Sequence, residues 1–409
     1  MVNWELPKSP VSVTNGCVNS SNPHADNLPR PPFPSAVALV IDTHAPLIDT
    51  DRAHPLALEA AVAAMAPATR SAITSDLRCF LKWCAARCPA AVAVPAAPET
   101  LVHYLRWLDE GTAERPGAKP ATLARRLASI ARIHRVLGFG ESEPLPTQAG
   151  MVRDTIKAIN RTRRQRQRQA APLRLGPAMH AAETPPDGVT VQALLASCTD
   201  NLSDLRDAAL ISLAYDAGLR VSELVDAEVR DVRQSPDGSG RLEIRHSKTD
   251  QTGEGALAWV SSETMMRISS WLRASGLTKG AIFRRINVLP ARRDGGPQEP
   301  LRYFVGARPL SRQGVVAILR RRVLAANDLG HFHIEPGCQL EVVRGMSAHS
   351  FRVGLTQDLF AAGEDGAGIA LALRWSSPTT ALRYARELAV GGNAAARVLG
   401  RMRSGRDCS

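Results

Sequence analysis

Apolar residues recur at three- and four-residue steps from about residue 67, a spacing that places them on one face of an α-helix. Ile73, Leu77 and Leu81 begin this pattern, and either Thr69 or Ser71 could cap the helix that carries them. The pattern predicts four short amphipathic helices, which begin near Pro67, Pro98, Pro120 and Gly150. Packed by their apolar faces, these helices would form a compact all-α domain.

The second half of the chain combines helices with a few short strands. Apolar segments predict helices over residues 189–198, 203–217, 262–274 and 311–326, with another that begins at Leu219. Residues 241–245 alternate between polar and apolar, and residues 256–260 could return beside them after a hairpin loop at 246–255. Residues 290–309 are rich in Gly, Pro and Arg and predict a loop. The expected fold class is therefore mainly α, with a small antiparallel sheet in the second half.

Changes in composition mark the expected domain limits. Residues 1–50 hold eight of the 28 prolines and no sustained apolar period, which predicts a disordered arm. Arginines are dense between Arg161 and Arg168, and such like charges predict an extended linker that is ordered only against an anion. The domains expected are a disordered arm at 1–50, a helical domain at 51–160, a basic linker at 161–188, a second domain at 189–390 and a terminal joint with a short helix at 391–409.

The net charge of the chain favours a polyanionic partner. Lys and Arg number 51 against 39 Asp and Glu, which gives a formal charge of +12 and a pI near 9.9. Because there is no apolar run of about 18 residues and no basic-then-apolar leader, we expect a cytoplasmic protein without membrane contact. Cys79, Cys84 and Cys88 lie close together, but no further ligands follow at zinc-site spacing, so packed thiols are favoured over a metal.

Polar residues of the second half stand at predicted helix starts or loop edges: Arg220, Lys248, His349, Arg352, Trp375 and Tyr384. Together these residue types could cleave a DNA phosphodiester without a metal. Two arginine forks can hold the non-bridging oxygens, and an indole N–H can donate to the phosphate. A lysine can protonate the leaving 5′ oxygen while a histidine exchanges a proton nearby. The tyrosine would be the nucleophile, and its phosphotyrosine would conserve the energy of the broken bond.

In this order the residues resemble the tyrosine recombinase, or phage integrase, family over about residues 65–405. Arg220 lies in Ala-Gly-Leu-Arg-Val-Ser-Glu-Leu, and His349 and Arg352 form a His-x-x-Arg box. Tyr384 lies in Thr-Thr-Ala-Leu-Arg-Tyr, which resembles the family's nucleophile segment. Trp375 stands where many members have a second His, and this residue together with the intervals between the motifs resembles the Cre-like branch.

The resemblance implies a helical core-binding domain that clamps DNA, followed by an α+β catalytic domain with a small antiparallel sheet. It implies site-specific recombination without metal or ATP, in which Tyr384 forms a 3′-phosphotyrosyl intermediate and strands are exchanged stepwise through a Holliday junction. The partners implied are double-stranded DNA with inverted-repeat half-sites, at the nucleoid, and further protomers in a homotetramer. Glu223 would orient neighbouring basic groups, and the segment 391–409 would dock on the adjacent protomer.

Three features depart from the pattern of that family. Arg374 precedes the Trp where Gly is usual, the loop at 290–309 is longer than in compact members, and the N-terminal arm has no counterpart. They concern target choice and regulation, because none of them removes a catalytic group.

The residues expected to contact DNA carry less distinctive signals. They are Arg125, Arg126, Arg161, Arg163, Arg164, Arg312 and Gln313. The first two would lie on the outer face of the third helix, the next three in the basic segment, and the last two behind Ser311, a candidate helix cap. Arg320–Arg322, further along the same helix, would touch phosphate or solvent. Each of these side chains could instead belong to an ordinary solvated surface.

Two other functions compete with recombination. A type IB topoisomerase would cleave and reseal DNA without exchanging partners, and a DNA-binding regulator could keep the fold without the chemistry. Taken singly, the site residues also have structural explanations: Arg220 and Glu223, one helical turn apart, could form a surface ion pair, and Tyr384 could pack its ring. The helical domain and the joint near Gly391 argue against the topoisomerase, and the joint presence of the whole set argues against the regulator.

Overall fold

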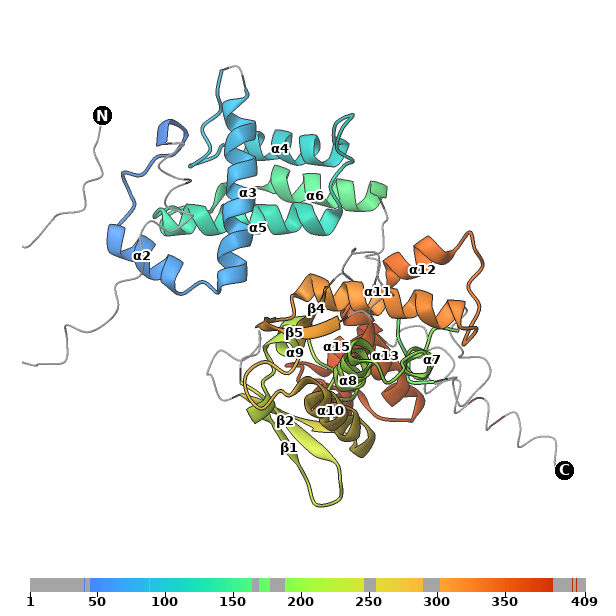
Figure 1. Cartoon of the computed structure of the whole chain (residues 1–409). Helices are drawn as coiled ribbons and strands as arrows, with labels where there is room; N and C mark the ends of the chain where they lie inside the picture. Colours follow the sequence, from blue (N-terminus) through green and yellow to red (C-terminus); the bar gives the residue numbers. More distant parts are fainter. Residues whose placement is uncertain are drawn as a thin grey trace, which may run out of the picture. The chain divides into compact units, whose positions relative to one another are not determined.

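The computed structural model of the chain divides into two compact units, residues 1–167 and 168–409 (Figure 1). The residues that it describes are 40, 45–87, 89–163, 169–176, 188–245, 255–289, 302–384, 399 and 402. The boundary between the units falls inside the basic segment 161–188. The first unit is helical and the second combines helices with antiparallel strands, so the expected fold class is confirmed.

The first unit is built from helices joined by short turns: η1 (Ala45–Leu47), α2 (Pro55–Ala63), α3 (Pro67–Ala85), α4 (Pro98–Glu110), α5 (Pro120–Val136), η2 (Pro146–Gln148) and α6 (Gly150–Arg163). The expected starts of α3 to α6 are confirmed, but the caps proposed for α3 are wrong. That helix already begins at Pro67, whose fixed φ suits a first helical turn, so Thr69 and Ser71 lie inside it. The sequence pattern also missed α2, whose Ala-rich, largely exposed residues carry little periodicity.

The core of the first unit gathers around α3, which crosses the layer of α4, α5 and α6 (Figure 1). Phe80 of α3 is fully buried and its ring lies 4.8 Å from that of Tyr104 in α4. Cys84 is also fully buried, and burial raises the pKa of its thiol to about 12, which confirms a packed thiol at this position. Cys88 lies outside the described residues.

The disordered arm expected over residues 1–50 is wrong at its end. Ile48 is buried and forms a bridge to Val94, and Val40 belongs to the same apolar core. Val40 and the residues from the 3-10 helix η1 to Ile48 therefore join the helical unit, although the prolines of residues 1–50 had suggested disorder. Residues 1–39 lie outside the described part of the chain.

The helices of the second unit are α7 (Val191–Ala196), α8 (Leu202–Asp216), α9 (Val221–Asp226), η4 (Val229–Asp231), α10 (Ser262–Ser275), α11 (Arg312–Asp328), α12 (Gln339–Gly345), α13 (His349–Ala361), α14 (Gly366–Ala372) and α15 (Pro378–Tyr384). Apolar α8 is the central element and contacts α7, α10 and α13. Leu210 and Leu213 of α8 are fully buried, as is Trp271 of α10, whose indole N–H donates to the carbonyl of Ile282 at 2.9 Å. A rigid helical core thus supports the elements around it.

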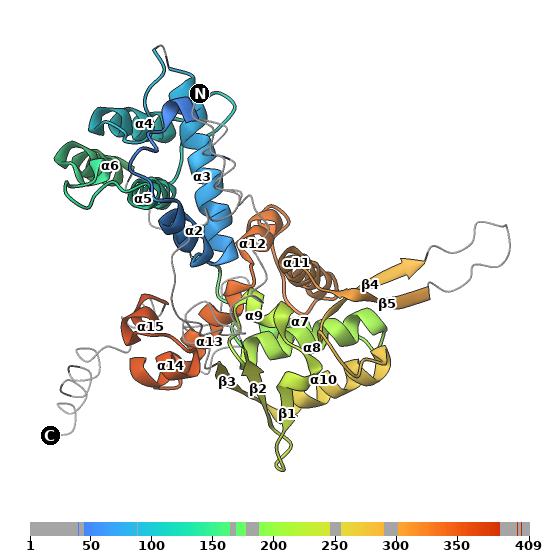
Figure 2. The same cartoon turned by 90° about the vertical axis from the view of Figure 1, so that its left-hand side faces the viewer.

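Two antiparallel sheets complete the second unit, and their strands are β1 (Val232–Gln234), β2 (Gly240–Ile244), β3 (Ala256–Val260), β4 (Arg284–Leu289) and β5 (Arg302–Pro309). The pairing of β2 with β3 confirms the expected strands. The loop expected at 290–309 is wrong over 302–309, because these residues pair with β4 to form a hairpin that projects from the unit (Figure 2). Ile286 of β4 and Val305 of β5 are cross-strand partners, and both pack against the core of the unit.

The start of the second unit corrects the expectation of an extended linker. Residues 169–176 lie along α13: the backbone N–H of Leu173 donates to the carbonyl of Ser350 at 3.0 Å, and Leu173 is fully buried. Arg174 is buried as well and donates to Asp358 of α13 at 2.5 Å. We call residues 169–175 the strap. Apolar and ionic contacts with α13 order it, so no anion is needed for this part of the basic segment.

Substitution of Gly354 by Ala is expected to detach the strap. A Cβ atom built on Gly354 would lie 1.8 Å from the carbonyl oxygen of Leu173, which is backbone and cannot rotate away. Alanine would gain only about 1 kcal/mol as a better helix former. We therefore expect Gly354→Ala to lower the free energy of unfolding by more than about 2 kcal/mol, because the strap must move.

Thermal unfolding and limited proteolysis within residues 169–175 would measure this effect. Gly337→Ala is the matched control, because nothing lies within 4 Å of a Cβ added there. Equal melting temperatures for Gly354→Ala and the wild type would contradict the close approach of strap and helix.

Candidate active site

Helix α13 brings His349 and Arg352 to one side of the second unit, because residues three apart share a helix face. Ser350 ties the helix start to the preceding turn, since its hydroxyl accepts from the backbone N–H of Ser347 at 3.0 Å. His349 is exposed, whereas Arg352 is only 1% exposed. The His-x-x-Arg box therefore offers one solvent-facing imidazole and one guanidinium held deep in the fold.

Tyr384 lies beside this pair at the end of α15. Its hydroxyl oxygen is 2.9 Å from Nε2 of His349, and the two rings meet edge to face with centroids 5.4 Å apart. The ring of Trp375 stacks on the other side of Tyr384, with centroids 5.4 Å apart and planes 18° from parallel. A tyrosine hydroxyl thus lies within hydrogen-bond reach of a possible proton acceptor, and its ring is fixed by stacking.

The guanidinium of Arg352 joins two loops of the site. One of its nitrogens donates to the carbonyl of Gly218 and the other to the carbonyl of Leu373 at 2.8 Å. It also lies 5.4 Å from the ring centroid of Trp375. Burial, and next the charges of Arg220 and Arg374, lower the pKa of Arg352 to about 9, so it remains charged at neutral pH. The site therefore concentrates positive charge that an anion would stabilise.

Arg220 stands at the start of α9, just after the glycine that ends the turn from α8. Its guanidinium donates to Glu223 at 2.7 Å and its backbone N–H donates to the other carboxylate oxygen at 3.0 Å, so the expected one-turn interaction is confirmed. Glu223 is buried. Burial alone would raise the pKa of Glu223, but these hydrogen bonds and the charge of Arg374 lower it below its usual value, so the carboxylate stays ionised.

Sequence reasoning missed the part that Arg374 plays at this site. Its φ of 55° is left-handed, and the backbone N–H groups of Arg374 and Trp375 donate to the carbonyls of Leu371 and Ala370. These two bonds form the Schellman motif that ends α14, a position where Gly is favoured and where a side chain costs about 1 kcal/mol. The sequence did signal this residue, because Arg374 stands where the family usually has Gly. The neighbouring residues in the sequence do not indicate which groups its side chain contacts.

Other expected site residues lie outside the described part of the chain or away from this cluster. Lys248, Arg164 and the segment 391–398 are not among the described residues. Arg161 is exposed at the end of α6, while Arg163 bonds Asp109 at 2.5 Å. The expected roles of these residues in catalysis, DNA binding and protomer docking therefore remain predictions.

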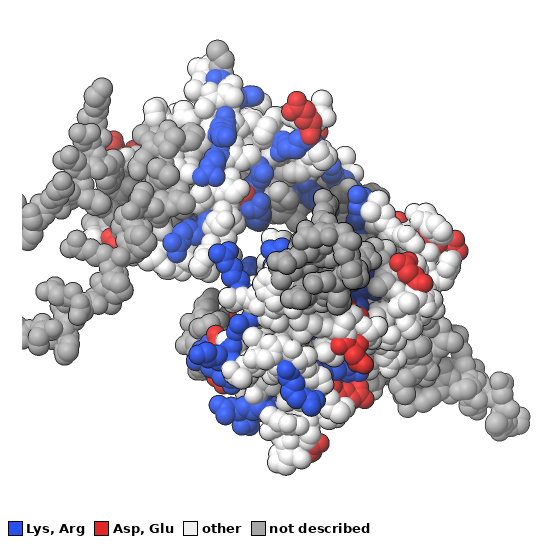
Figure 3. Space-filling view, in the orientation of Figure 1, with Lys and Arg blue, Asp and Glu red and all other residues white. Residues whose placement is uncertain are grey.

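Arg125 and Arg126 were expected on the outer face of α5, but both form ion pairs with Asp76 of α3. Arg125 pairs with buried Asp76, and Arg126 donates to the hydroxyl of Tyr104 at 3.1 Å with its side chain only 18% exposed. Arg126 therefore turns inward, whereas Arg125 remains half exposed. Lys and Arg still predominate on the face of the first unit seen in Figure 3.

The basic residues of helix α11 include both exposed and buried side chains. The hydroxyl of Ser311 accepts from the backbone N–H of Gly314 at 3.0 Å, so the predicted cap is confirmed and Arg312 and Gln313 are exposed beside it. The expectation that all of Arg320–Arg322 face phosphate or solvent is wrong. Arg322 is buried and pairs with Asp207 at 2.7 Å, because a buried cation in this core needs a carboxylate partner.

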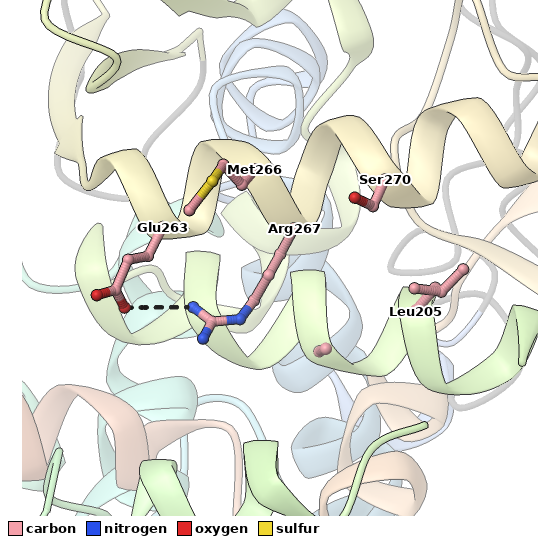
Figure 4. Close-up of a pocket in the computed structure, with 6 residues that line it drawn as sticks. Leu205, Glu263, Met266, Arg267 and Ser270 are labelled. Carbon is pink, nitrogen blue, oxygen red and sulfur yellow. Dashed lines mark ion pairs between the residues drawn. The ribbon is translucent and has the colours of Figure 1, made fainter. Parts of the chain in front are cut away.

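The hollow shown in Figure 4 does not involve the residues of this cluster. This shallow hollow between α8 and α10 is lined by Leu205, Met266 and Ser270, and also by Glu263 and Arg267 of α10, which form an ion pair at 3.7 Å (Figure 4). The described residues contain no group of His, Cys, Asp and Glu that could hold a metal ion. Among the described helices none is both long and apolar enough to span a membrane.

Three comparisons relate the chain to known proteins. Residues 187–389 match the model of the phage integrase family. An integrase/recombinase xerD homolog of Selenomonas ruminantium is 32% identical over 226 residues, which cover 53% of this chain and 59% of that relative, less than two thirds of its length. Recombinase cre of Escherichia phage P1 is 24% identical over 298 residues, 72% of this chain and 77% of that relative. A solved structure of the Tn1549 transposon integrase in complex with transposon right end DNA is 14% identical, covers 78% of this chain and 90% of its own, and has a TM-score of 0.48.

Proposed function

We propose that the chain is a tyrosine recombinase of the phage integrase family, whose model matches residues 187–389, and that it is a site-specific recombinase that cleaves and rejoins DNA through a 3′-phosphotyrosyl intermediate. The observation that carries the proposal is the 2.9 Å approach of the Tyr384 hydroxyl to Nε2 of His349, beside the guanidinium groups of Arg220 and Arg352. The relatives named recombinase support the same class of reaction.

In the proposed reaction, Tyr384 attacks the scissile phosphate and transfers its proton toward His349. Arg220 and Arg352 hold the non-bridging oxygens, where their charge stabilises the extra negative charge of the transition state. Trp375 supports the phosphate and the nucleophile ring. The 5′ oxygen leaves and takes a proton, for which we propose Lys248 as the donor. The phosphotyrosine keeps the bond energy, so neither a metal ion nor ATP is required for rejoining.

We propose that exchange occurs between DNA sites built of inverted-repeat half-sites, within a homotetramer and through a Holliday junction, at the nucleoid in the cytoplasm. Exposed Arg161, Arg312 and Gln313 are the described side chains best placed to approach DNA, together with half-exposed Arg125. The N-terminus of α11 would enter a major groove, because Arg and Gln can each make two hydrogen bonds with a purine. The segment 391–409 would dock on the adjacent protomer.

Covalent trapping tests the function without knowledge of the target sequence. The full chain is incubated with a pool of random-sequence duplexes that carry nicks, so that cleavage near a nick releases a short strand and prevents resealing. Complexes that survive denaturant are recovered, their DNA is sequenced, and the modified peptide is mapped. We expect a DNA phosphate attached to Tyr384 and an enriched sequence with inverted symmetry.

The selected DNA then separates the competing functions. Two copies of the selected site on one molecule should yield recombinant products, whereas relaxation of supercoils without recombinants would indicate a topoisomerase. Saturable binding with no covalent complex from any pool would indicate a regulator and would end the proposal of catalysis.

The fall of the cleavage rate at low pH should report the protonation of His349. Partial removal from water, and then the charges of Arg352 and Arg220, lower the pKa of His349 below its usual 6.5. Only the neutral imidazole accepts a proton, so cleavage should stay level as the pH falls to about 6.5 and decline below it. His349→Gln keeps a hydrogen-bond partner for Tyr384 but should cleave about 10²-fold more slowly, without the acid decline.

Single-turnover rates at subsaturating DNA, from about pH 5 to 9, would give this profile for the free protein. His331→Gln is the control, since His331 is an exposed histidine of the same unit. A wild-type decline that begins well above pH 7 would contradict the direction of the shift.

A further inference from the structure

Arg374 connects the end of α14 to the turn that carries Arg220. One nitrogen of its guanidinium donates to the carbonyl of Ala217 at 2.9 Å. The other donates to the carbonyl of Gly218 at 3.2 Å and to Oε2 of Glu223 at 3.3 Å. The side chain is only 9% exposed, so these contacts are well shielded from water. Three bonds from one side chain thereby fix both the backbone turn and the carboxylate behind Arg220.

The contacts of Arg374 interlock with those of the two arginines assigned to the phosphate. Oε1 of Glu223 accepts from the guanidinium of Arg220, while Oε2 accepts from the Arg220 backbone N–H and from Arg374. The carbonyl of Gly218 accepts from Arg352 as well as from Arg374. A displacement of Arg374 would therefore remove one of the hydrogen bonds to Oε2 of Glu223 and loosen a carbonyl that also holds Arg352.

We propose that Arg374 is a positioning residue of the reaction, which acts through Glu223 and the Ala217–Gly218 turn to keep Arg220 and Arg352 aligned on the scissile phosphate. This inference rests on the function proposed above. It explains why a left-handed position with φ of 55° holds a large side chain: backbone strain persists where the surrounding structure uses it. The guanidinium of Arg374 also offsets the charge of ionised Glu223, so that the positive charges of Arg220 and Arg352 are not reduced by it.

Two substitutions separate positioning from a simple structural role. Glycine relieves the left-handed backbone of residue 374 by about 1 kcal/mol, which offsets part of the cost of the lost hydrogen bonds, so Arg374→Gly should stay folded and lower the melting temperature only modestly. Arg374→Asn also tolerates this backbone and keeps a side chain. In both variants we expect single-turnover cleavage of the selected DNA to fall by about 30- to 100-fold, with less than a threefold change in DNA affinity. Arg374→Lys, which keeps the charge but loses the fork, should fall between these variants and the wild type.

A double-mutant cycle with Glu223→Gln tests the route of the effect. If Arg374 acts through Glu223, the variant with both substitutions should cleave no more than about threefold more slowly than the slower single variant. Wild-type cleavage rates in Arg374→Gly and Arg374→Asn would overturn the inference, as would fully multiplicative losses in the cycle. Failure of the wild type to form any covalent complex would instead overturn the proposed function, so the two failures are distinguishable.

Discussion

A Tyr384→Phe variant is expected to form no covalent complex with the selected DNA, with cleavage lower by at least about 10⁴-fold. The substitution removes only the hydroxyl that lies 2.9 Å from Nε2 of His349. The ring would still stack on Trp375, at the 5.4 Å separation that the tyrosine shows. No neighbouring hydroxyl among the described residues of this cluster has the same contacts, so the covalent route should be lost while the site keeps its shape.

Stability and DNA binding should change little in this variant. The lost hydrogen bond is solvent-exposed at the His349 ring, and such a bond contributes about 1 kcal/mol or less. Denaturing gels after incubation with the nicked DNA, together with thermal unfolding and a binding titration, would measure all three quantities. Tyr303→Phe is the matched control, because Tyr303 is a 42% exposed tyrosine on β5 of the same unit. A covalent complex in Tyr384→Phe at the wild-type rate would show that another residue is the nucleophile.

The parts of the site that could be predicted from the sequence depend on short-range geometry. His349 and Arg352 share a face because they are three apart in a helix, and Arg220 meets Glu223 for the same reason. The cap at Ser311 likewise needs only the residue type and its position before an apolar period. These features required no knowledge of distant contacts, and the order of the motifs then related them to a family.

The parts that could not be predicted depend on which distant atoms meet. Arg126 and Arg322 looked like surface charges, but buried partners far away in sequence turn both inward. The strap looked like an open basic linker, and only the missing side chain of Gly354 on α13 makes room for its carbonyl at Leu173. Arg374 was visible as an unusual residue, yet its contact with Glu223 spans 151 positions. A one-dimensional pattern contains no such pairing information.

After Tyr384, substitution of Arg352 should reduce the cleavage rate most. We expect Arg352→Lys to cleave about 10³-fold more slowly, although the charge is kept. A lysine ammonium has three N–H donors on one nitrogen, so it cannot span the carbonyls of Gly218 and Leu373 and also present a flat pair of donors to a phosphate. Arg352→Met, which fills similar space without charge, should lose at least as much.

The loss of cleavage should be this large because one guanidinium both binds the phosphate and holds two segments of the site together. The carbonyls it binds belong to the turn before Arg220 and to the loop before Trp375, so the guanidinium holds together the segments that carry the other phosphate ligands. Because Arg352 is only 1% exposed, loss of its bonds would take a donor away from the carbonyl of Leu373 and one of two donors away from that of Gly218, and would lower the free energy of unfolding by about 1–3 kcal/mol.

Cleavage rates must therefore be compared at a temperature well below the melting transition of each variant. Arg273→Lys is the matched control, since Arg273 is an exposed arginine of α10 in the same unit and should tolerate the change in both assays. Arg220→Lys provides an internal scale: the side chain of Arg220 is 21% exposed and so is less buried than that of Arg352, and this variant should lose cleavage with less loss of stability. If Arg352→Lys retained cleavage within about tenfold of the wild type, a charge at this position would suffice and the fork geometry would not be the source of phosphate binding.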